Sequence, residues 1–584
     1  MTVTQAVILA GGKGTRLEKV SGGLPKPLVP VAGVPVIVHQ IKLLSRYGVK
    51  RVFITTGFKA DELSAALGDG SRWGVILEYV HEEEPLGTAG GVAALAGHLQ
   101  GDFFVLYGDV LVNMDLVRLA VAHLDKHADA TIVVHPNDHP YDSDLVACGD
   151  DNRITKLFAY PRSADVGDLP NLVSAALYVL SDSVFEYIDS GSKQDFIRDV
   201  FPRMSLVCRL FAYPTTEYLK DMGTPDRLQK VEKDIQSGKV KRLHADYRRP
   251  VLFLDRDGVL NEEVNGVTQP DALRLIPGAA AAVALANRAG WLVAVVTNQP
   301  AIAKGFMTEG DLKRVHNRLE TLLGEQSAWI DVLEYCPHHP EVGHVGERPE
   351  LKVECNCRKP NPGLLQQAAK RIPADLSCSV MIGDHWRDVV AARRFGLDAI
   401  AVRTGHGYRD VVPAEYVSEG VADLVVEDLE VAVRVLLEEP GELDHIADRI
   451  VAAKGQEKKP GLITFSGGNE SDRARQVFQL RQELRARGMR CRAWSLDGWH
   501  GNTELERQYP ISATANALLR NELVQLPDTR SAMADVVEES RTALIRLKAD
   551  VLILHGQDVE SASLENVISH ERTWTTWTER NQEG

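Results

Sequence analysis

Two aspartates, Asp255 and Asp257, stand two positions apart at the end of the apolar run VLFL. Such a run is typical of a buried strand, and residues two apart on a strand point to the same side. Paired carboxylates of this kind suit a nucleophile and its acid–base partner. The spacing therefore predicts a catalytic site at the end of a strand.

Polar residues also follow the later apolar runs of this part of the chain. They are Thr297 and Asn298 after WLVAVV, Lys359 in CRKPNPG, and Asp384 with Asp388 in MIGDHWRD. These stations, in this order, resemble the haloacid dehalogenase (HAD) phosphatase superfamily over about residues 249–430. A single DxD pair is also compatible with a solvated strand end, but the ordered set favours the phosphatase.

The resemblance implies a role for each station. Asp255 would attack phosphorus to form an aspartyl phosphate, and Asp257 would protonate the leaving oxygen and later activate water. Mg²⁺ would be bound by Asp255, Asp384 and the backbone carbonyl of Asp257, while Thr297 and Lys359 would stabilise the transferring group.

Three cysteines crowd around one loop between these stations. With a neighbouring histidine they supply four ligands that suit tetrahedral Zn²⁺, which predicts a structural site just ahead of Lys359. The ligands are Cys336, His338, Cys355 and Cys357. His339 and His344 are nearby alternatives to His338, and free cysteines near a surface are the other interpretation.

Longer motifs narrow the resemblance to one branch of the superfamily. FLDRDGVLN, TNQPAIAKGF, CPHH, CNCRKPNPG and IGD are similar to heptose 1,7-bisphosphate 7-phosphatases, with histidinol-phosphate phosphatases as close relatives. That similarity implies that Arg358 and Asn298 contact the substrate.

A second set of motifs lies near the N-terminus, where the strand-like run QAVILA leads into GGKGTRL and then PKP. Glycines let backbone N–H groups approach phosphate oxygens, and Arg16 and Lys26 add positive charge. A glycine-rich turn alone is weak evidence. Together with PLGTAGG, LYGD and DMGTPDRL, however, it resembles the sugar-1-phosphate nucleotidyltransferases over about residues 4–235.

This resemblance implies direct attack of a sugar phosphate oxygen on the nucleotide α-phosphorus, with pyrophosphate leaving. Arg16 and Lys26 would stabilise phosphate charge, and Asp109 and Asp221 would hold Mg²⁺. The alternative is that these aspartates only cap helices. The residues expected to enclose the nucleotide are Gly11, Gly12, Gly14, Thr15, Gly87, Thr88 and Ala89.

The sugar half of this site departs from the family pattern. Ser174, Ala175 and Ala176 replace the usual Asn-Ala-Gly, and Ala159, Tyr160 and Pro161 replace the usual Glu-Lys-Pro. We therefore expect an unusual sugar or a slow reaction at a site whose nucleotide half is intact.

The last part of the chain resembles P-loop kinases of the uridine kinase type, with strands GLITFSGG, RCRAWSLD and ADVLILHG. Where that family needs Gly-Lys-Ser/Thr for phosphate and Mg²⁺, this chain has Asp472, Arg473 and Ala474. We expect a degenerate domain that phosphorylates nothing and serves assembly or regulation.

Strand-like and helical patterns alternate along all 584 residues, which predicts α/β architecture with parallel sheets. Polar stretches divide the chain into three Rossmann-like domains: a nucleotidyltransferase at 1–240, a phosphatase with a zinc loop at 248–437 and the P-loop-like domain at 458–584. In each of the three domains a predicted strand ends in a Gly- or Asp-rich loop. Open α/β sheets bind ligands at such loops.

The formal net charge of −15 disfavours binding to nucleic acid or anionic membrane. No apolar run is long enough to span a bilayer, and the N-terminus lacks the form of a signal peptide. Seven cysteines without an even framework fit a reducing compartment. We expect a cytoplasmic protein whose partners are sugar phosphates and nucleoside triphosphates, and the sequence leaves its oligomeric state open.

The two enzymatic parts make sequential steps if the phosphatase produces the heptose 1-phosphate that the transferase uses. GTP is the favoured nucleotide because the first part resembles heptose 1-phosphate guanylyltransferases. Two alternatives stay open. One pairs a histidinol-phosphate-type or other sugar-phosphate phosphatase with a transferase for a different sugar, and the other makes the first part a nucleotide-sugar sensor that regulates the phosphatase.

Overall fold

The computed structural model describes most of the chain as far as the phosphatase part extends, and shorter segments beyond it. The described residues are 3–12, 22–57, 59–163, 167–264, 266–416, 419–437, 447–448, 461–466, 470–487, 489, 491–495, 551–555 and 575–580. Contacts group the chain into two compact units. Unit 1 is Met1–Arg248 with Lys313–Asp331, and unit 2 is Arg249–Leu312 with Val332–Gly584. The division into three domains remains a prediction.

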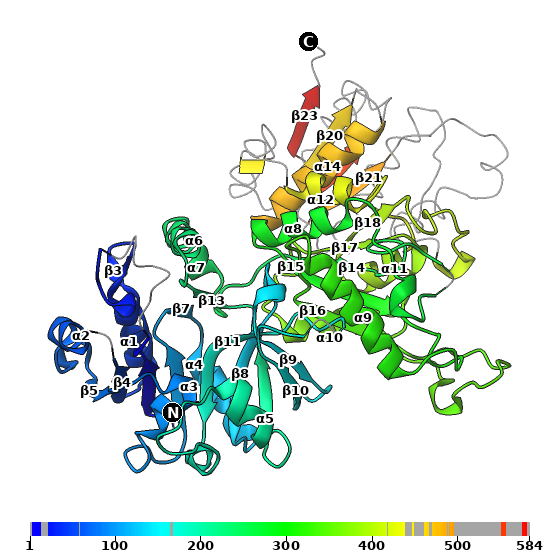
Figure 1. The fold of residues 1–584 in the computed structure, drawn as a ribbon. Helices are drawn as coiled ribbons and strands as arrows, with labels where there is room; N and C mark the ends of the chain where they lie inside the picture. The colour runs from blue at the N-terminus through cyan, green and yellow to red at the C-terminus, as the bar shows by residue number, and fades with distance from the viewer. Residues whose placement is uncertain are drawn as a thin grey trace, which may run out of the picture. The chain divides into compact units, whose positions relative to one another are not determined.

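Unit 1 is built on a nine-stranded sheet in which β1 pairs in parallel with β4 and β6 (Figure 1). The strands are β1 (Gln5–Leu9), β4 (Arg51–Thr56), β5 (Ile76–His81), β6 (Phe103–Tyr107), β8 (Ala130–His135), β9 (Leu145–Cys148), β10 (Ile154–Phe158), β11 (Val173–Leu180) and β12 (Leu210–Pro214). Strand β11 runs antiparallel to β6 and carries β8 and β9 on its other edge. Two-stranded sheets pair β2 (Pro30–Val31) with β3 (Val34–Pro35) and β7 (Val110–Asn113) with β13 (Tyr218–Asp221).

Both faces of the large sheet are buried, as its nearly continuous apolar strands predict. Along β1, Ala6 and Ile8 belong to one hydrophobic core and Val7 to the other, because successive side chains alternate between faces. Helices α1 and α4 contribute to the first core, and α3 and α5 to the second. The helices of this unit are α1 (Val36–Arg46), α2 (Ala60–Leu67), α3 (Gly87–Ala93), α4 (Leu116–Asp125), α5 (Phe201–Met204), α6 (Pro225–Gln236) and α7 (Lys239–Arg242).

Unit 2 contains a six-stranded, wholly parallel sheet in the order β16-β15-β14-β17-β18-β19. The strands are β14 (Val251–Leu254), β15 (Leu292–Asn298), β16 (Val332–Cys336), β17 (Val380–Gly383), β18 (Asp398–Val402) and β19 (Leu424–Val426). Because β14 lies between β15 and β17, the carboxyl ends of these three strands meet at one edge. That arrangement brings Asp255, Thr297 and Asp384 together.

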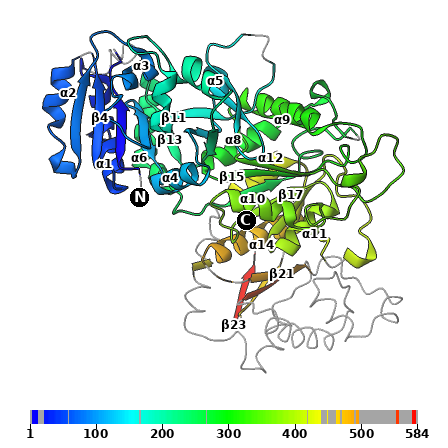
Figure 2. The same cartoon turned by 90° about the horizontal axis from the view of Figure 1, so that it is seen from below.

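Helices cover both faces of this sheet. Helices α8 and α12 contact each other on one face, and α10 and α11 pack on the other (Figures 1 and 2). Their bounds are α8 (Ala279–Ala289), α10 (Gly363–Arg371), α11 (Trp386–Phe395) and α12 (Leu429–Leu437), and α9 spans Glu309–Gly324.

A further four-stranded parallel sheet has the order β21-β22-β20-β23. Its elements are β20 (Gly461–Ser466), α14 (Glu470–Ala486), β21 (Cys491–Ser495), β22 (Val551–His555) and β23 (Thr575–Arg580). All the sheets together confirm the predicted α/β class. Within the described residues, no helix combines the length and apolar character needed to cross a bilayer.

Candidate active sites

Lys359 lies at the centre of the site in unit 2. Its Nζ is 2.9 Å from Asp255 Oδ1 and 2.6 Å from Asp388 Oδ1, and it donates to the Val296 carbonyl at 2.8 Å. The side chain is only 2% exposed. Burial lowers the pKa of the ammonium group, but the two carboxylates outweigh that effect and raise the pKa above its ordinary value. Lys359 is therefore a fixed, buried positive charge beside the predicted nucleophile.

Asn298 holds the backbone of Lys359 in place. Its Oδ1 accepts from Lys359 N at 3.0 Å, and its Nδ2 donates to Lys359 O at 3.1 Å. This double contact joins the end of β15 to the loop that carries Lys359. The side chain that the sequence suggested as a substrate contact is thus engaged in positioning the lysine.

Asp257 is surrounded by a separate group of hydrogen-bond donors. Arg256 Nη2 donates to both of its oxygens, at 2.8 and 2.7 Å, and Asn261 Nδ2 and Gln299 Nε2 donate at 2.9 and 2.8 Å. Burial raises its pKa, yet the adjacent Arg256 and these hydrogen bonds outweigh burial and lower it. Gln299 also donates to Thr297 Oγ1 at 2.9 Å. Sequence reasoning missed Gln299, although it directly follows the TN motif.

Two further carboxylates lie close to that of Asp255. Oxygens of Asp255, Asp384 and Asp388 lie within 4.8 Å of one another. Burial, together with the neighbouring carboxylates, raises the pKa of Asp255 to about 7 and that of Asp384 to about 8. Buried oxygens with this excess of negative charge fit a hard cation such as Mg²⁺. The cluster contains the predicted Asp255 and Asp384, and adds the side chain of Asp388.

Local structure explains why these carboxylates point at one another. Asp388 accepts from His385 N at 3.2 Å in a capping box that starts α11, which leaves its other oxygen for Lys359. Asp384 accepts from His406 N at 2.7 Å. Gly258 has φ 79°, and a Cβ there would collide with the Asp384 carboxylate, so the DRDG turn needs its glycine.

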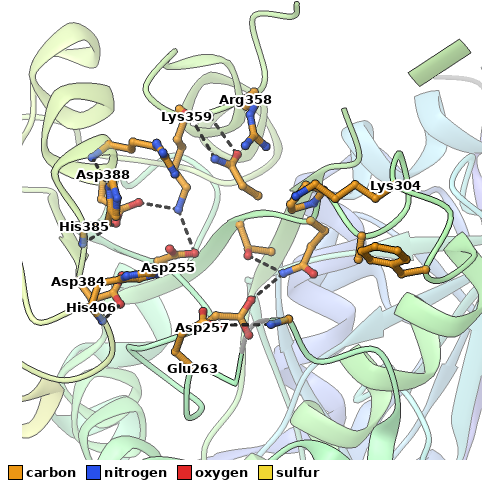
Figure 3. A pocket seen from close by; sticks show the side chains of 18 residues that line it. Asp255, Asp257, Glu263, Lys304, Arg358, Lys359, Asp384, His385, Asp388 and His406 are labelled. Carbon is orange, nitrogen blue, oxygen red and sulfur yellow. Dashed lines mark hydrogen bonds and ion pairs between the residues drawn. The ribbon is translucent and has the colours of Figure 1, made fainter. Parts of the chain in front are cut away.

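A cleft of about 360 Å³ opens above these groups (Figure 3). The side chains described above line it: Asp255, Asp257, Thr297, Lys359, Asp384 and Asp388. Three cations, Lys304, Arg358 and Arg387, line it as well. None of the three has a carboxylate within ion-pair distance in the part of the chain that the structure describes. Arg358 Nη1 donates to the His338 carbonyl at 3.2 Å.

The predicted zinc ligands converge beside this cleft. The Sγ atoms of Cys336, Cys355 and Cys357 are 3.2 to 3.6 Å apart, and His338 Nδ1 lies 3.3 Å from Cys357 Sγ and 3.6 Å from Cys336 Sγ. Four ligands around Zn²⁺ with Zn–S bonds of about 2.3 Å would give edges of about 3.8 Å. The set therefore fits a small tetrahedral ion. Of the three candidate histidines, it is His338 that lies with the cysteines, rather than His339 or His344. Cys357 precedes Lys359 by two residues, so a metal held by this set would anchor the loop that carries Lys359.

In unit 1 the two predicted metal ligands lie at adjacent strand ends, with Asp109 directly before β7 and Asp221 the last residue of β13. Asp221 is opposite Val110 in the β13–β7 pair, and Met222 N donates to Asp109 O at 2.9 Å. Lys26 Nζ forms an ion pair with Asp109. The structure thus brings Lys26, Asp109 and the end of β13 together, although they are far apart in the sequence.

Arg227 holds the carboxylate of Asp221. Its Nη1 is 2.8 Å from Asp221 Oδ2, and its Nη2 is 2.9 Å from Asp142 Oδ2. Burial raises the pKa of Asp221, but Arg227 outweighs burial and lowers it. Arg227 stands in the DMGTPDRL motif, yet the sequence alone gave it no role.

The predicted nucleotide-binding segments are only partly within the described residues. Gly87 has φ 78°, and a Cβ there would collide with the Gln194 carbonyl, which accepts from Ala89 N at 3.0 Å. Thr88 Oγ1 donates to Asp195 Oδ2 at 2.7 Å. Gly11 and Gly12 follow β1. Gly14, Thr15 and Arg16 lie outside the described residues.

The altered sugar strand carries an unusual backbone. Ala176 has φ 56°, in the left-handed region that favours glycine, and the pairing register of β11 with β8 shifts between Ser174 and Tyr178. Tyr178 OH donates to Tyr107 OH at 3.2 Å. An alanine thus adopts a backbone conformation that favours glycine, at the position where the sequence pattern expects a glycine.

Comparisons with known proteins follow the same division of the chain. The family model described as Nucleotidyl transferase matches residues 5–238, and the model described as HAD-hydrolase-like matches residues 356–432. The mannose-1-phosphate guanylyltransferase of Mycobacterium tuberculosis is 33% identical over 236 residues, which are 40% of this chain and 65% of that protein. The chain thus spans slightly less than two thirds of this relative.

Relatives of the central part are matched over nearly their whole length. The D-glycero-D-manno-heptose-1,7-bisphosphate 7-phosphatase of Thermosynechococcus vestitus is 40% identical over 188 residues, which are 32% of this chain and 94% of that protein. Among solved structures, the D,D-heptose 1,7-bisphosphate phosphatase from B. bronchiseptica is 32% identical, with a TM-score of 0.28, and covers 32% of this chain and 98% of that one.

The folds, the sites and these matches define an α/β enzyme that fuses a nucleotidyltransferase domain to a HAD-type phosphatase. Through its central part, the chain belongs to the family of the heptose-1,7-bisphosphate 7-phosphatases. The two resemblances predicted from the sequence are confirmed, whereas the P-loop kinase resemblance of the last part remains a prediction.

Proposed function

We propose that this enzyme catalyses two consecutive steps of nucleotide-activated heptose synthesis. The first removes the 7-phosphate of heptose 1,7-bisphosphate, and the second transfers a nucleotidyl group, GMP from GTP by preference, to the resulting heptose 1-phosphate. The observation that carries the proposal is the Asp255–Lys359–Asp388 cluster at the carboxyl edge of the unit 2 sheet, in a chain that also contains a nucleotidyltransferase domain.

In the phosphatase step, an Asp255 oxygen attacks phosphorus and the bond from phosphorus to the sugar oxygen breaks. Asp257 donates a proton to the departing sugar oxygen, then takes one from the water that hydrolyses the aspartyl phosphate. Lys359 neutralises phosphate oxygens, and Thr297 donates to them. Mg²⁺ bound by Asp255, Asp384 and the Asp257 carbonyl, with Asp388 close by, would supply further charge neutralisation.

The three cations that line the cleft without a carboxylate partner in the described part of the chain, Lys304, Arg358 and Arg387, support a substrate with two phosphates. Lys359 and a metal ion suffice for the phosphate that reacts on the cleft floor. Lys304, Arg358 and Arg387 lack carboxylate partners among the described residues, so they are available to a second anionic group. Guanidinium groups bind phosphate in bidentate fashion, which favours the two arginines for this task.

In the transfer step, an oxygen of the sugar 1-phosphate attacks the α-phosphorus and pyrophosphate leaves with the bonding electrons. Lys26 and Arg16 neutralise the phosphates and hold them in line. Mg²⁺ between Asp109 and Asp221 would bring together the two negatively charged reactants. The segments at Gly11–Gly14 and Gly87–Ala89 enclose the nucleotide.

Further parts of the proposal concern the setting of the enzyme. A structural Zn²⁺ held by Cys336, His338, Cys355 and Cys357 would fix the loop ahead of Lys359. We place the protein in the cytoplasm, where reduced cysteines, nucleoside triphosphates and sugar phosphates are available.

The altered β11 supports one alternative, a nucleotide-sugar sensor in place of the transferase. One experiment separates the alternatives. Purified full-length protein receives heptose 1,7-bisphosphate, Mg²⁺ and each nucleoside triphosphate in turn, and phosphate and pyrophosphate are measured separately. We expect both products with GTP. Release of phosphate but no pyrophosphate with every nucleotide would favour the nucleotide-sugar sensor. Faster hydrolysis of histidinol phosphate than of heptose 1,7-bisphosphate would overturn the heptose assignment.

A further inference from the structure

Helix α14 lies against the amino-terminal edge of the phosphatase sheet. Asp398 is the first residue of β18, and Asp423 directly precedes β19. In a parallel sheet, the amino ends of the strands lie at the edge opposite the carboxyl ends, and it is the carboxyl ends that carry the catalytic aspartates. Contacts made here by α14 are therefore remote from the chemistry.

The contact is a cluster of buried charges. Arg481 Nη2 is 3.0 Å from Asp398 Oδ1 and 2.5 Å from Asp423 Oδ1, and Arg485 Nη1 is 2.6 Å from Asp398 Oδ1. Gln482 Nε2 donates to Asp398 Oδ2 at 2.6 Å. The side chain of Asp398 is fully buried, and those of Asp423 and Arg481 are each 6% exposed. Water therefore contributes little to the solvation of these charges.

The phosphatase itself supplies only one of the three guanidinium groups. Arg393 of α11 is 2.7 Å from Asp423 Oδ2 and 3.9 Å from Asp398 Oδ1. If Arg481 and Arg485 lost their charges while α14 stayed in place, the two carboxylates would share a single positive charge, and Asp398 would have only the more distant contact. A buried carboxylate without a close partner is strongly destabilising. Arg481 and Arg485 remove this deficit.

Apolar packing accompanies the ion pairs. Val477, Phe478, Leu480 and Leu484 of α14 are buried. Gln479 Nε2 donates to the Val435 carbonyl near the end of α12 at 3.2 Å. Helix α14 contacts α12 and β19 of the phosphatase as well as β20, β21 and β22 of its own sheet, so it is packed on both sides.

From this geometry we infer that the edge formed by Asp398 and Asp423 is a docking site for α14, and that this helix stabilises the phosphatase. The occupant is the chain's own helix, selected by charge complementarity. Asp423 also accepts from Ala399 N at 2.8 Å, so the cluster links β18 to the residue ahead of β19. Docking would thus restrain the last two strands of the sheet and leave the catalytic edge unchanged.

The test uses the full chain and hydrogen exchange of the amides of β18 and β19. In a variant with Arg481→Gln and Arg485→Gln, we expect these amides to exchange at least about tenfold faster, because a buried carboxylate loses its partners. The matched control carries Arg434→Gln and Arg487→Gln, which also remove two positive charges. Arg434 pairs with Glu430 on α12, and Arg487 pairs with Asp448 and with Glu483 of α14. It should exchange like the unmodified protein.

A second variant guards against general misfolding. Arg481→Gln alone should be partly rescued by Asp423→Asn, because removing the partner charge restores balance. Turnover of heptose bisphosphate per folded molecule should stay within about twofold throughout, and the exchange readout does not depend on that substrate being correct. Unchanged exchange in the double-arginine variant, or equal acceleration in the control, would overturn the inference.

Discussion

Asp255, Asp384 and Asp388 crowd around one ammonium group in the phosphatase, whereas in the transferase Asp109 pairs with Lys26, and Asp221 shares Arg227 with Asp142. Burial, together with the neighbouring carboxylates, raises the pKa of Asp255 to about 7, while Arg227 outweighs burial and lowers that of Asp221. The first cluster therefore has an excess of negative charge, which a bound metal would offset. In the transferase each predicted metal ligand already has an ion-pair partner, so a metal would compete there with Lys26 and Arg227.

The largest expected effect separates the two sites. Asp255→Asn removes the nucleophile, so phosphate release from heptose 1,7-bisphosphate should fall by at least about 10³-fold. Pyrophosphate release from supplied heptose 1-phosphate and GTP should persist, because the substitution leaves unit 1 unchanged. Loss of both activities in a folded variant would mean that the sites do not act independently.

Asp109→Ala or Asp221→Ala should reduce pyrophosphate release by about 10²-fold or more, since each removes a charge that holds the metal. A Mg²⁺ titration of the remaining activity should shift to higher concentration. Asp226→Ala is the control, because Asp226 is adjacent to Arg227 in the sequence but takes no part in the ion pairs that Arg227 forms. Turnover equal to that of the control would place the metal elsewhere.

Cys355→Ser with Cys357→Ser should abolish bound zinc, which we expect at one per chain, and lower the thermal stability of the phosphatase. Elemental analysis and thermal unfolding measure the two effects. Cys378→Ser, a cysteine outside the cluster, should change neither. Unmodified protein purified without chelator that contains no zinc would contradict this prediction.

Arg387→Gln should raise the KM for heptose 1,7-bisphosphate about tenfold, the effect of losing one charge-assisted contact to a phosphate. Hydrolysis of a monophosphate such as p-nitrophenyl phosphate should change little, because the floor of the cleft is intact. Arg394→Gln, which loses contacts with Glu419, Asn361 and Tyr416 but none with residues that line the cleft, is the matched control. A parallel loss on both substrates would refute a role in holding the second phosphate.

The smallest effect concerns the altered sugar strand. Ala176→Gly should increase the free energy of unfolding by roughly 0.5 to 1 kcal/mol, because glycine adopts φ 56° without the strain of a Cβ. Asn152→Gly is the control, since asparagine tolerates its φ of 65°. Denaturant unfolding measures both changes. Destabilisation by Ala176→Gly would show that the methyl group contributes more by packing than it costs in strain.

Sequence motifs were sufficient to predict the α/β class, the nucleotidyltransferase and phosphatase resemblances, and the zinc ligand set that converges in the structure. They succeed because motif residues such as Gly258 and Lys359 are restricted by close contact with the reacting groups. The carboxyl-terminal resemblance lacked the key Gly-Lys-Ser/Thr residues, and so it remains a prediction.

Only the tertiary structure revealed the roles of Gln299, Arg227 and Asp388, because each acts through a partner that is distant in the sequence or on another element. The same holds for Arg481 and Asp398, which are 83 residues apart in number and meet in one buried cluster. Residue types fix what chemistry is available. Which charges become partners, and therefore which pKa values shift and which side chains are held, depends on burial and distance, and the fold alone sets these.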